Sequence, residues 1–123
     1  MVFDQRLRIL RDGNVISPEV EAKVRRVITR FKEHWHIELT EENGSRMITH
    51  LAMALMRIEK GEEIQSPDFD ILEEFREHAV FPLSQKILED LISFTPMKLP
   101  DSEKNYIIVN ICVILDTENE NII

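Results

Sequence analysis

Three side chains near the middle of the chain have types and spacing suited to handling a phosphoryl group. His50 lies four residues after Arg46 and seven before Arg57, so on a helix all three fall within about 40° of one another. Along the axis the two arginines lie roughly 6 Å and roughly 10 Å from the histidine, separations that long side chains can shorten. A neutral imidazole nitrogen can attack phosphorus, and guanidinium groups match phosphoryl oxygens. The alternative is that His50 only belongs to a solvated helix face.

The remaining histidines and the single cysteine give weaker indications of function than His50 does. His34 and His36 form a His-x-His pair, but residues two apart on a helix diverge by about 200° and no further ligands accompany them, so we expect no metal site. We expect His78, near a helix C-terminus, and Cys112, in an apolar run, to be structural. The sequence contains no glycine-rich phosphate loop, Cys-x-x-Cys, Gly-x-Ser-x-Gly or His-Glu-x-x-His motif. We therefore expect no cofactor and no catalysis by this chain alone.

Helices must position these side chains, because apolar residues recur with helical spacing along most of the sequence. All three glycines and most of the five prolines fall between the periodic segments, as expected for an all-α protein. The pattern predicts a compact bundle of about five helices, preceded by a short leading helix in residues 1–16. The five are expected over residues 17–35, 45–61, 66–79, 82–92 and 100–115.

Capping residues mark several of the expected boundaries. Ser17 precedes a proline and an acidic first turn, which is a strong helix start, and Ser66 begins a second Ser-Pro-acid sequence. Ser45 is expected to cap the helix that carries His50, and Gly61 to end it. Pro82 is expected to open the fourth helix.

The last periodic segment is compatible with two structures. Ile107, Val109 and Ile111 alternate as in a buried strand. The opening at Pro100, followed by acidic residues, and the short loops favour a helix instead.

Composition limits the functions that the chain can have. It has 123 residues, a formal net charge of −8 and no block of Lys or Arg, so we expect no direct binding of nucleic acid. The longest apolar run is about half of the ~20 residues needed to cross a bilayer, so we expect no membrane insertion. A single cysteine and a start without signal-peptide features favour the cytoplasm. We expect a leader over residues 1–16, one helical domain over 17–116 and a polar, frayed tail over 117–123.

Two stretches resemble the signatures of one known family. Residues 48–61 resemble the histidine motif of the PTS regulation domain (PRD), in which an arginine follows the histidine by seven residues, as Arg57 follows His50. Residues 99–111 resemble the second signature, with Leu-Pro, an acidic turn, Glu103, Tyr106 and an apolar run. The resemblance extends from about residue 18 to about residue 115.

The resemblance implies a stand-alone, homodimeric regulatory module of the bacterial sugar phosphotransferase system. In such modules a histidine accepts phosphate from the phosphocarrier protein or from a sugar permease component, and the phosphate changes dimer packing and the activity of an effector. By this comparison His50 is the phosphoacceptor and Arg57 accompanies it. Arg46 joins them through its position on the same helix face.

Two departures from the family pattern leave an alternative open. Thr49 stands where the family often has an acidic residue, and Asn110 replaces the second histidine. An amide cannot accept a phosphoryl group as an imidazole does. The chain is either a one-site phosphoacceptor or a non-phosphorylated interaction and dimerisation module that kept the fold. We expect Asn110 to share a helix face with Glu103 and to lie near His50.

Overall fold

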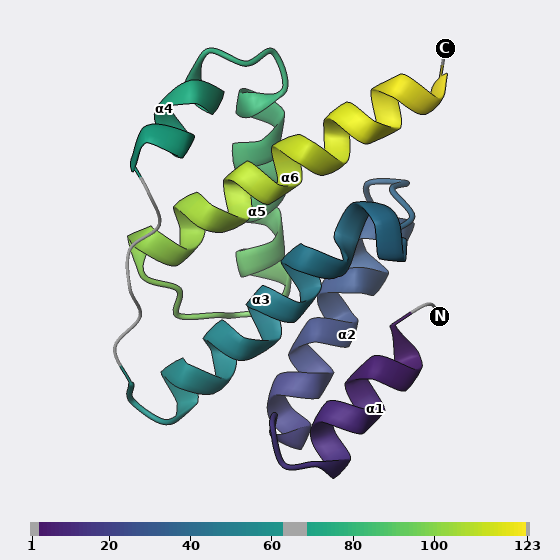
Figure 1. Ribbon diagram of the computed structural model, residues 1–123, viewed down its shortest axis with the longest axis vertical. Helices are drawn as coiled ribbons and strands as arrows, with labels where there is room; N and C mark the ends of the chain where they lie inside the picture. Colours follow the sequence, from purple (N-terminus) through teal and green to yellow (C-terminus); the bar gives the residue numbers. More distant parts are fainter. Residues whose placement is uncertain (1–2, 63–68, 123) are drawn as a thin grey trace.

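The computed structural model describes residues 3–62 and 69–122, and among these residues the chain is helical with no strand (Figure 1). The helices are α1 (Asp4–Asp12), α2 (Pro18–Glu33), α3 (Glu41–Glu59), α4 (Phe69–Arg76), α5 (Phe81–Phe94) and α6 (Asp101–Ile122). The prediction of an all-α bundle with a short leading helix and five further helices is confirmed. The last segment is a helix, and the strand alternative is wrong.

Several helix boundaries follow the signals in the sequence. The Ser17 hydroxyl accepts the N–H of Val20 at 3.1 Å and caps α2, with proline as the first helical residue. Pro82 lies in the first turn of α5. Gly61, just beyond the end of α3, has a φ of +74°, a conformation that glycine adopts without a Cβ penalty. The Ser66 start lies outside the described residues.

The start of α3 differs from the prediction, because Thr40 caps this helix and Ser45 does not. Thr40 Oγ1 accepts the N–H of Asn43 at 3.2 Å, and Asn43 Oδ1 accepts the N–H of Thr40 at 2.7 Å. This reciprocal capping box satisfies two backbone donors, whereas a single serine satisfies one. Gly44 therefore lies within the helix, where a Cβ atom would come within 3.2 Å of the Leu39 side chain. The glycine makes room for a buried leucine and does not mark a loop.

Two helices also end at residues that their apolar stripes did not predict. α4 ends at Arg76, three residues before the end of its stripe. The backbone of α6 continues to Ile122, beyond residue 116, where we expected a frayed tail. No glycine or proline occurs between residues 101 and 123 to stop this helix.

The two longest helices, α3 and α6, lie side by side at the centre of the bundle and run in opposite directions (Figure 1). α2 packs against α3. Both α5 and α4 pack against α6, and α1 lies outside α2. Fully buried side chains from these helices form one apolar core, which includes Leu7, Val24, Phe31, Ile48, Ile87, Leu91, Ile111 and Ile114. This core fixes which faces of α3 and α6 meet.

A polar cluster also joins α2 to α5. Arg30 contacts both oxygens of Asp90, at 2.9 and 2.7 Å, and the Trp35 indole N–H donates to the same carboxylate at 2.9 Å. These hydrogen bonds, from Arg30 first, lower the pKa of Asp90 to about 2. The carboxylate is therefore ionised across the physiological pH range.

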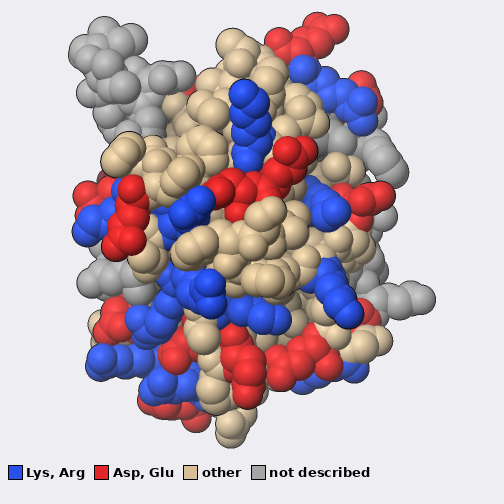
Figure 2. All heavy atoms as spheres, turned by 180° about the vertical axis from the view of Figure 1, so that it is seen from behind, with Lys and Arg blue, Asp and Glu red and all other residues tan. Residues whose placement is uncertain are grey.

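Basic and acidic side chains are interspersed on the face shown in Figure 2, without a large patch of one sign. None of the helices in the described part of the chain combines the length and the apolar character that crossing a bilayer requires.

Candidate functional site

The site is built around a contact between His50 of α3 and two side chains of α6. His50 Nε2 lies 2.5 Å from Oε2 of Glu103. The imidazole also stacks on the Tyr106 ring, with centroids 3.9 Å apart and planes 26° from parallel. The two sequence motifs, whose key residues are 53 positions apart, therefore meet in space.

The partners of this contact differ in their exposure to solvent. The Glu103 side chain is 2% exposed, whereas the His50 side chain is 26% exposed. A buried carboxylate requires a hydrogen-bond partner, and the imidazole supplies it. The ring is thus held from the inside and remains reachable from the outside.

Local structure explains why these side chains face each other. Glu103 lies in the first turn of α6, where an acidic side chain is favoured by the helix dipole, and its backbone N–H bonds to the Pro100 carbonyl at 3.0 Å. On α3, the buried residues Met47, Leu51 and Ala54 turn their side of the helix to the core. His50 therefore falls at the edge of the buried face, beside α6.

Arg46 and Arg57 lie on α3 with His50, as the spacing predicts, and both side chains are exposed. Neither forms a hydrogen bond or an ion pair with another residue in the described ranges. Both guanidinium groups are therefore exposed and unpaired within the described part of the chain.

Asn110 follows Tyr106 by one helical turn and Glu103 by two, so all three share a face of α6. Its side-chain amide donates to the Tyr106 carbonyl at 2.9 Å. Among the described residues, no hydrogen bond joins Asn110 to His50. The amide of Asn110 is used within its own helix.

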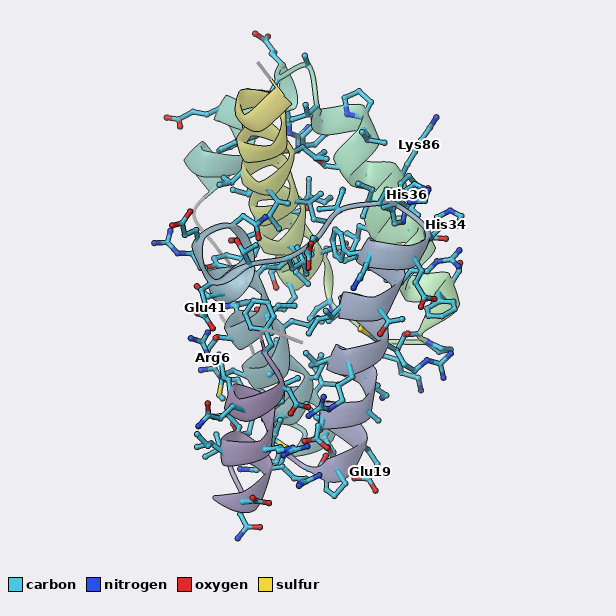
Figure 3. All side chains as sticks on the ribbon, turned by 90° about the vertical axis from the view of Figure 1, so that its right-hand side faces the viewer. Arg6, Glu19, His34, His36, Glu41 and Lys86 are labelled. Carbon is cyan, nitrogen blue, oxygen red and sulfur yellow. The ribbon has the colours of Figure 1, made fainter. Side chains whose placement is uncertain are left out.

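Arg6 is a neighbour of the site that sequence reasoning missed. It extends from α1 to α3, where one guanidinium nitrogen donates to Thr49 Oγ1 at 3.2 Å and the other lies 2.7 Å from Glu41 (Figure 3). A third arginine therefore lies beside the residue that precedes His50. No local pattern could have indicated it, because its partners are 35 and 43 residues away in the sequence.

The remaining histidines lie elsewhere. His34 is the C-cap of α2, and His36 follows it with a φ of +57°; both are exposed and lie close together near the C-terminal end of α2 (Figure 3). His78 Nε2 pairs with Asp116 of α6 at 3.1 Å. No group of three metal-ligating side chains occurs in residues 3–62 and 69–122.

Cys112 is a buried part of the core. Its sulfur lies 3.1 Å from the hydroxyl oxygen of Ser84, and burial raises the pKa of the thiol. A protonated, enclosed thiol is a poor nucleophile.

Comparison with known proteins identifies the family. The family model described as PRD domain matches residues 25–111, a range that includes His50, Glu103 and Asn110 but not α1. The chain is 24% identical to the uncharacterized protein YhfY of Escherichia coli (strain K12) over 120 residues, which are 98% of this chain and 100% of that protein. It is 30% identical to an uncharacterized protein of Haemophilus influenzae (strain ATCC 51907 / DSM 11121 / KW20 / Rd) over 107 residues, 87% of this chain and 83% of that protein. No solved structure matches the chain. The family match spans most of the sequence and both motifs, and the chain therefore belongs to the PRD domain family of PTS regulation modules.

Proposed function

We propose that this PRD domain is a one-site phosphoacceptor that regulates another protein in response to sugar transport. His50 accepts the phosphoryl group from the phosphocarrier protein or from a sugar permease component, in the cytoplasm. Arg57 and Arg46 bind the phosphoryl oxygens. The chain acts as a regulator and not as an enzyme, and it signals through a second copy of itself or through a partner protein.

The observation that carries this proposal is the contact of His50 with Glu103 and Tyr106. It joins the two motifs into one site on facing helices, with a reachable imidazole above a buried carboxylate. An arrangement of this kind holds the histidine ring in one orientation, whereas a freely solvated histidine has no such constraint.

Charge gives the site a means of switching. A phosphoryl group adds close to two negative charges to a chain of net charge −8, beside two exposed arginines without partners in the described ranges. Attraction to those arginines competes with repulsion from any acidic surface packed nearby. A coupling free energy of about 1–3 kcal/mol is typical of such switches and is sufficient to shift a balanced assembly equilibrium.

A second function is favoured by two other observations. Asn110 replaces the second histidine of the family and is hydrogen-bonded within α6. The pair of His50 and Glu103 also links α3 to α6 without any phosphate. On these grounds the alternative is a module that dimerises or docks on a partner and is not phosphorylated.

Phosphoryl transfer from a labelled carrier protein distinguishes the two functions. The full chain is incubated with ³²P-phosphorylated phosphocarrier protein, and the product is tested for a label that is lost in acid and kept in base. The decisive variant is His50→Gln, because its side-chain N–H can still meet Glu103 whereas it cannot accept a phosphoryl group as imidazole does. His36→Gln is the matched control on an exposed histidine.

We expect a label on the wild type and on His36→Gln, and none on His50→Gln. An unlabelled wild type, or a label that persists in His50→Gln, contradicts the proposal. In that case self-association that is indifferent to His50→Gln and to phosphoryl donors supports the alternative.

A further inference from the structure

We propose that Glu103 fixes the tautomer of His50, so that Nδ1 and not Nε2 is the nitrogen that takes the phosphoryl group. This inference rests on the proposed function of His50 and adds to it the reacting atom and a positioning residue.

The hydrogen bond between His50 and Glu103 determines which ring nitrogen carries the proton. An ionised carboxylate can only accept hydrogen bonds, and Oε2 of Glu103 lies 2.5 Å from Nε2 of His50, a short separation for a bond to a charged acceptor. The shared proton therefore belongs to Nε2. In the neutral ring the lone pair is then on Nδ1, which makes no hydrogen bond with a residue in the described ranges.

Charge and space also keep a phosphoryl group away from Nε2. A phosphoryl group that approached Nε2 would have to occupy the position of the Glu103 oxygen, and both groups are anionic. Glu103 cannot turn out into water, because its side chain is 2% exposed and belongs to a helix packed against α3. The carboxylate thus blocks one ring nitrogen and leaves the other open.

The contacts of the imidazole ring also fix its orientation. Tyr106 stacks on the imidazole at 3.9 Å, which limits rotation of the ring out of its plane. Rotation by 180° about the bond to Cβ would also replace the N–H facing Glu103 by a C–H and leave a buried carboxylate without its donor. The observed orientation is therefore strongly preferred.

The transfer step follows from this geometry. The Nδ1 lone pair forms the new N–P bond while the bond from phosphorus to the donor's nitrogen or sulfur breaks, and the donor group leaves with that electron pair. Nε2 keeps its proton throughout. The product is a phosphorylated imidazolium whose positive charge faces Glu103, so the carboxylate stabilises the charge that develops in the ring.

The first test needs no phosphorylation. Long-range ¹H–¹⁵N correlation spectra of the unmodified wild-type protein at pH 8 report which nitrogen of each histidine carries the proton. We expect His50 to show a protonated Nε2 and an unprotonated Nδ1, with an N–H signal that is absent from His50→Gln. A proton on Nδ1 of His50 overturns the proposal.

The second test uses phosphoramidate, a small phosphoryl donor, with ¹H–¹⁵N and ³¹P spectra to identify the phosphorylated nitrogen. We expect the Nδ1 product to exceed the Nε2 product at His50 by at least about tenfold, a ratio that corresponds to a difference of 1.4 kcal/mol. The exposed His36 serves as an internal reference, because it has no hydrogen bond or ion pair with a carboxylate among the described residues. In Glu103→Leu, which fills the space without an acceptor, the product at His50 should shift toward Nε2.

A predominantly Nε2 product at wild-type His50 overturns the inference, as does phosphorylation of His34 or His36 with none at His50. Failure of the proposed function gives a different result. The carrier protein then leaves the chain unlabelled, whereas the Nε2–H tautomer and the Nδ1 product from phosphoramidate are still observed.

Discussion

Replacing His50 by alanine should destabilise the fold as well as remove the proposed acceptor. The change leaves Glu103, whose side chain is 2% exposed, without the donor that compensates its burial. Stranding such a group costs about 1–3 kcal/mol, and losing the stacking on Tyr106 costs about 0.5–1.5 kcal/mol. We therefore expect His50→Ala to lower the free energy of unfolding by about 2–4 kcal/mol.

A double-mutant cycle separates the pair from the individual side chains. Urea unfolding at pH 7, followed by circular dichroism, is measured for the wild type, His50→Ala, Glu103→Leu and the double variant. Because the second substitution removes the stranded carboxylate, the double variant should be more stable than His50→Ala by about 1–2 kcal/mol. In His50→Gln, which keeps an N–H donor, the loss should be about 1 kcal/mol.

A double variant less stable than His50→Ala would contradict this prediction, as would a coupling free energy below about 0.5 kcal/mol. Either result would mean that the carboxylate finds other partners or water when the imidazole is absent. Lys86→Ala, at an exposed position of α5, is the control and should leave stability nearly unchanged.

Three further predictions concern other parts of the fold. Hydrogen bonds hold the pKa of Asp90 at about 2, below its unfolded value of 3.8. The ionised carboxylate therefore stabilises the fold above pH 3.8, and this contribution is lost as the pH falls to about 2. The thermal unfolding temperature of Asp90→Asn should depend less steeply on pH in that window than the unfolding temperature of the wild type. Thr40→Ala should cost about 1 kcal/mol through loss of the α3 cap, whereas Ser45→Ala should change the unfolding free energy by less than about 0.5 kcal/mol. Cys112, a buried thiol of raised pKa, should resist alkylation by iodoacetamide at pH 7 in the native protein and react after unfolding in urea, as mass spectrometry can show.

The helices could be predicted because each boundary signal acts locally. Ser17 capped α2 and Pro82 opened α5 as expected, and the apolar stripes identified most of the core. The start of α3 was harder, because Thr40 and Ser45 are both good capping residues. Thr40 caps the helix because Asn43, three residues later, completes a reciprocal capping box with it, whereas Ser45 has no such partner three residues later in the sequence.

The site could be predicted only in part, because it depends on a contact between two helices. The resemblance named His50, Glu103 and Tyr106, but no spacing in the sequence indicates that they touch across two helices. That contact depends on how α3 and α6 pack. Arg6 gave no signal at all, since it reaches the site from α1, outside the range of the family match.

Position-specific mapping of the transferred phosphate shows which histidine accepts the phosphoryl group. Trypsin separates the four histidines into three peptides. Cleavage at Arg46 and Arg57 gives the peptide 47–57, in which His50 is the single histidine. His34 and His36 lie in the peptide 33–46, and His78 lies in the peptide 77–86. After transfer from the phosphorylated carrier protein and digestion at alkaline pH, we predict that phosphate is found on peptide 47–57 alone. Phosphate on either of the other two peptides, or on none of the three, would contradict the account.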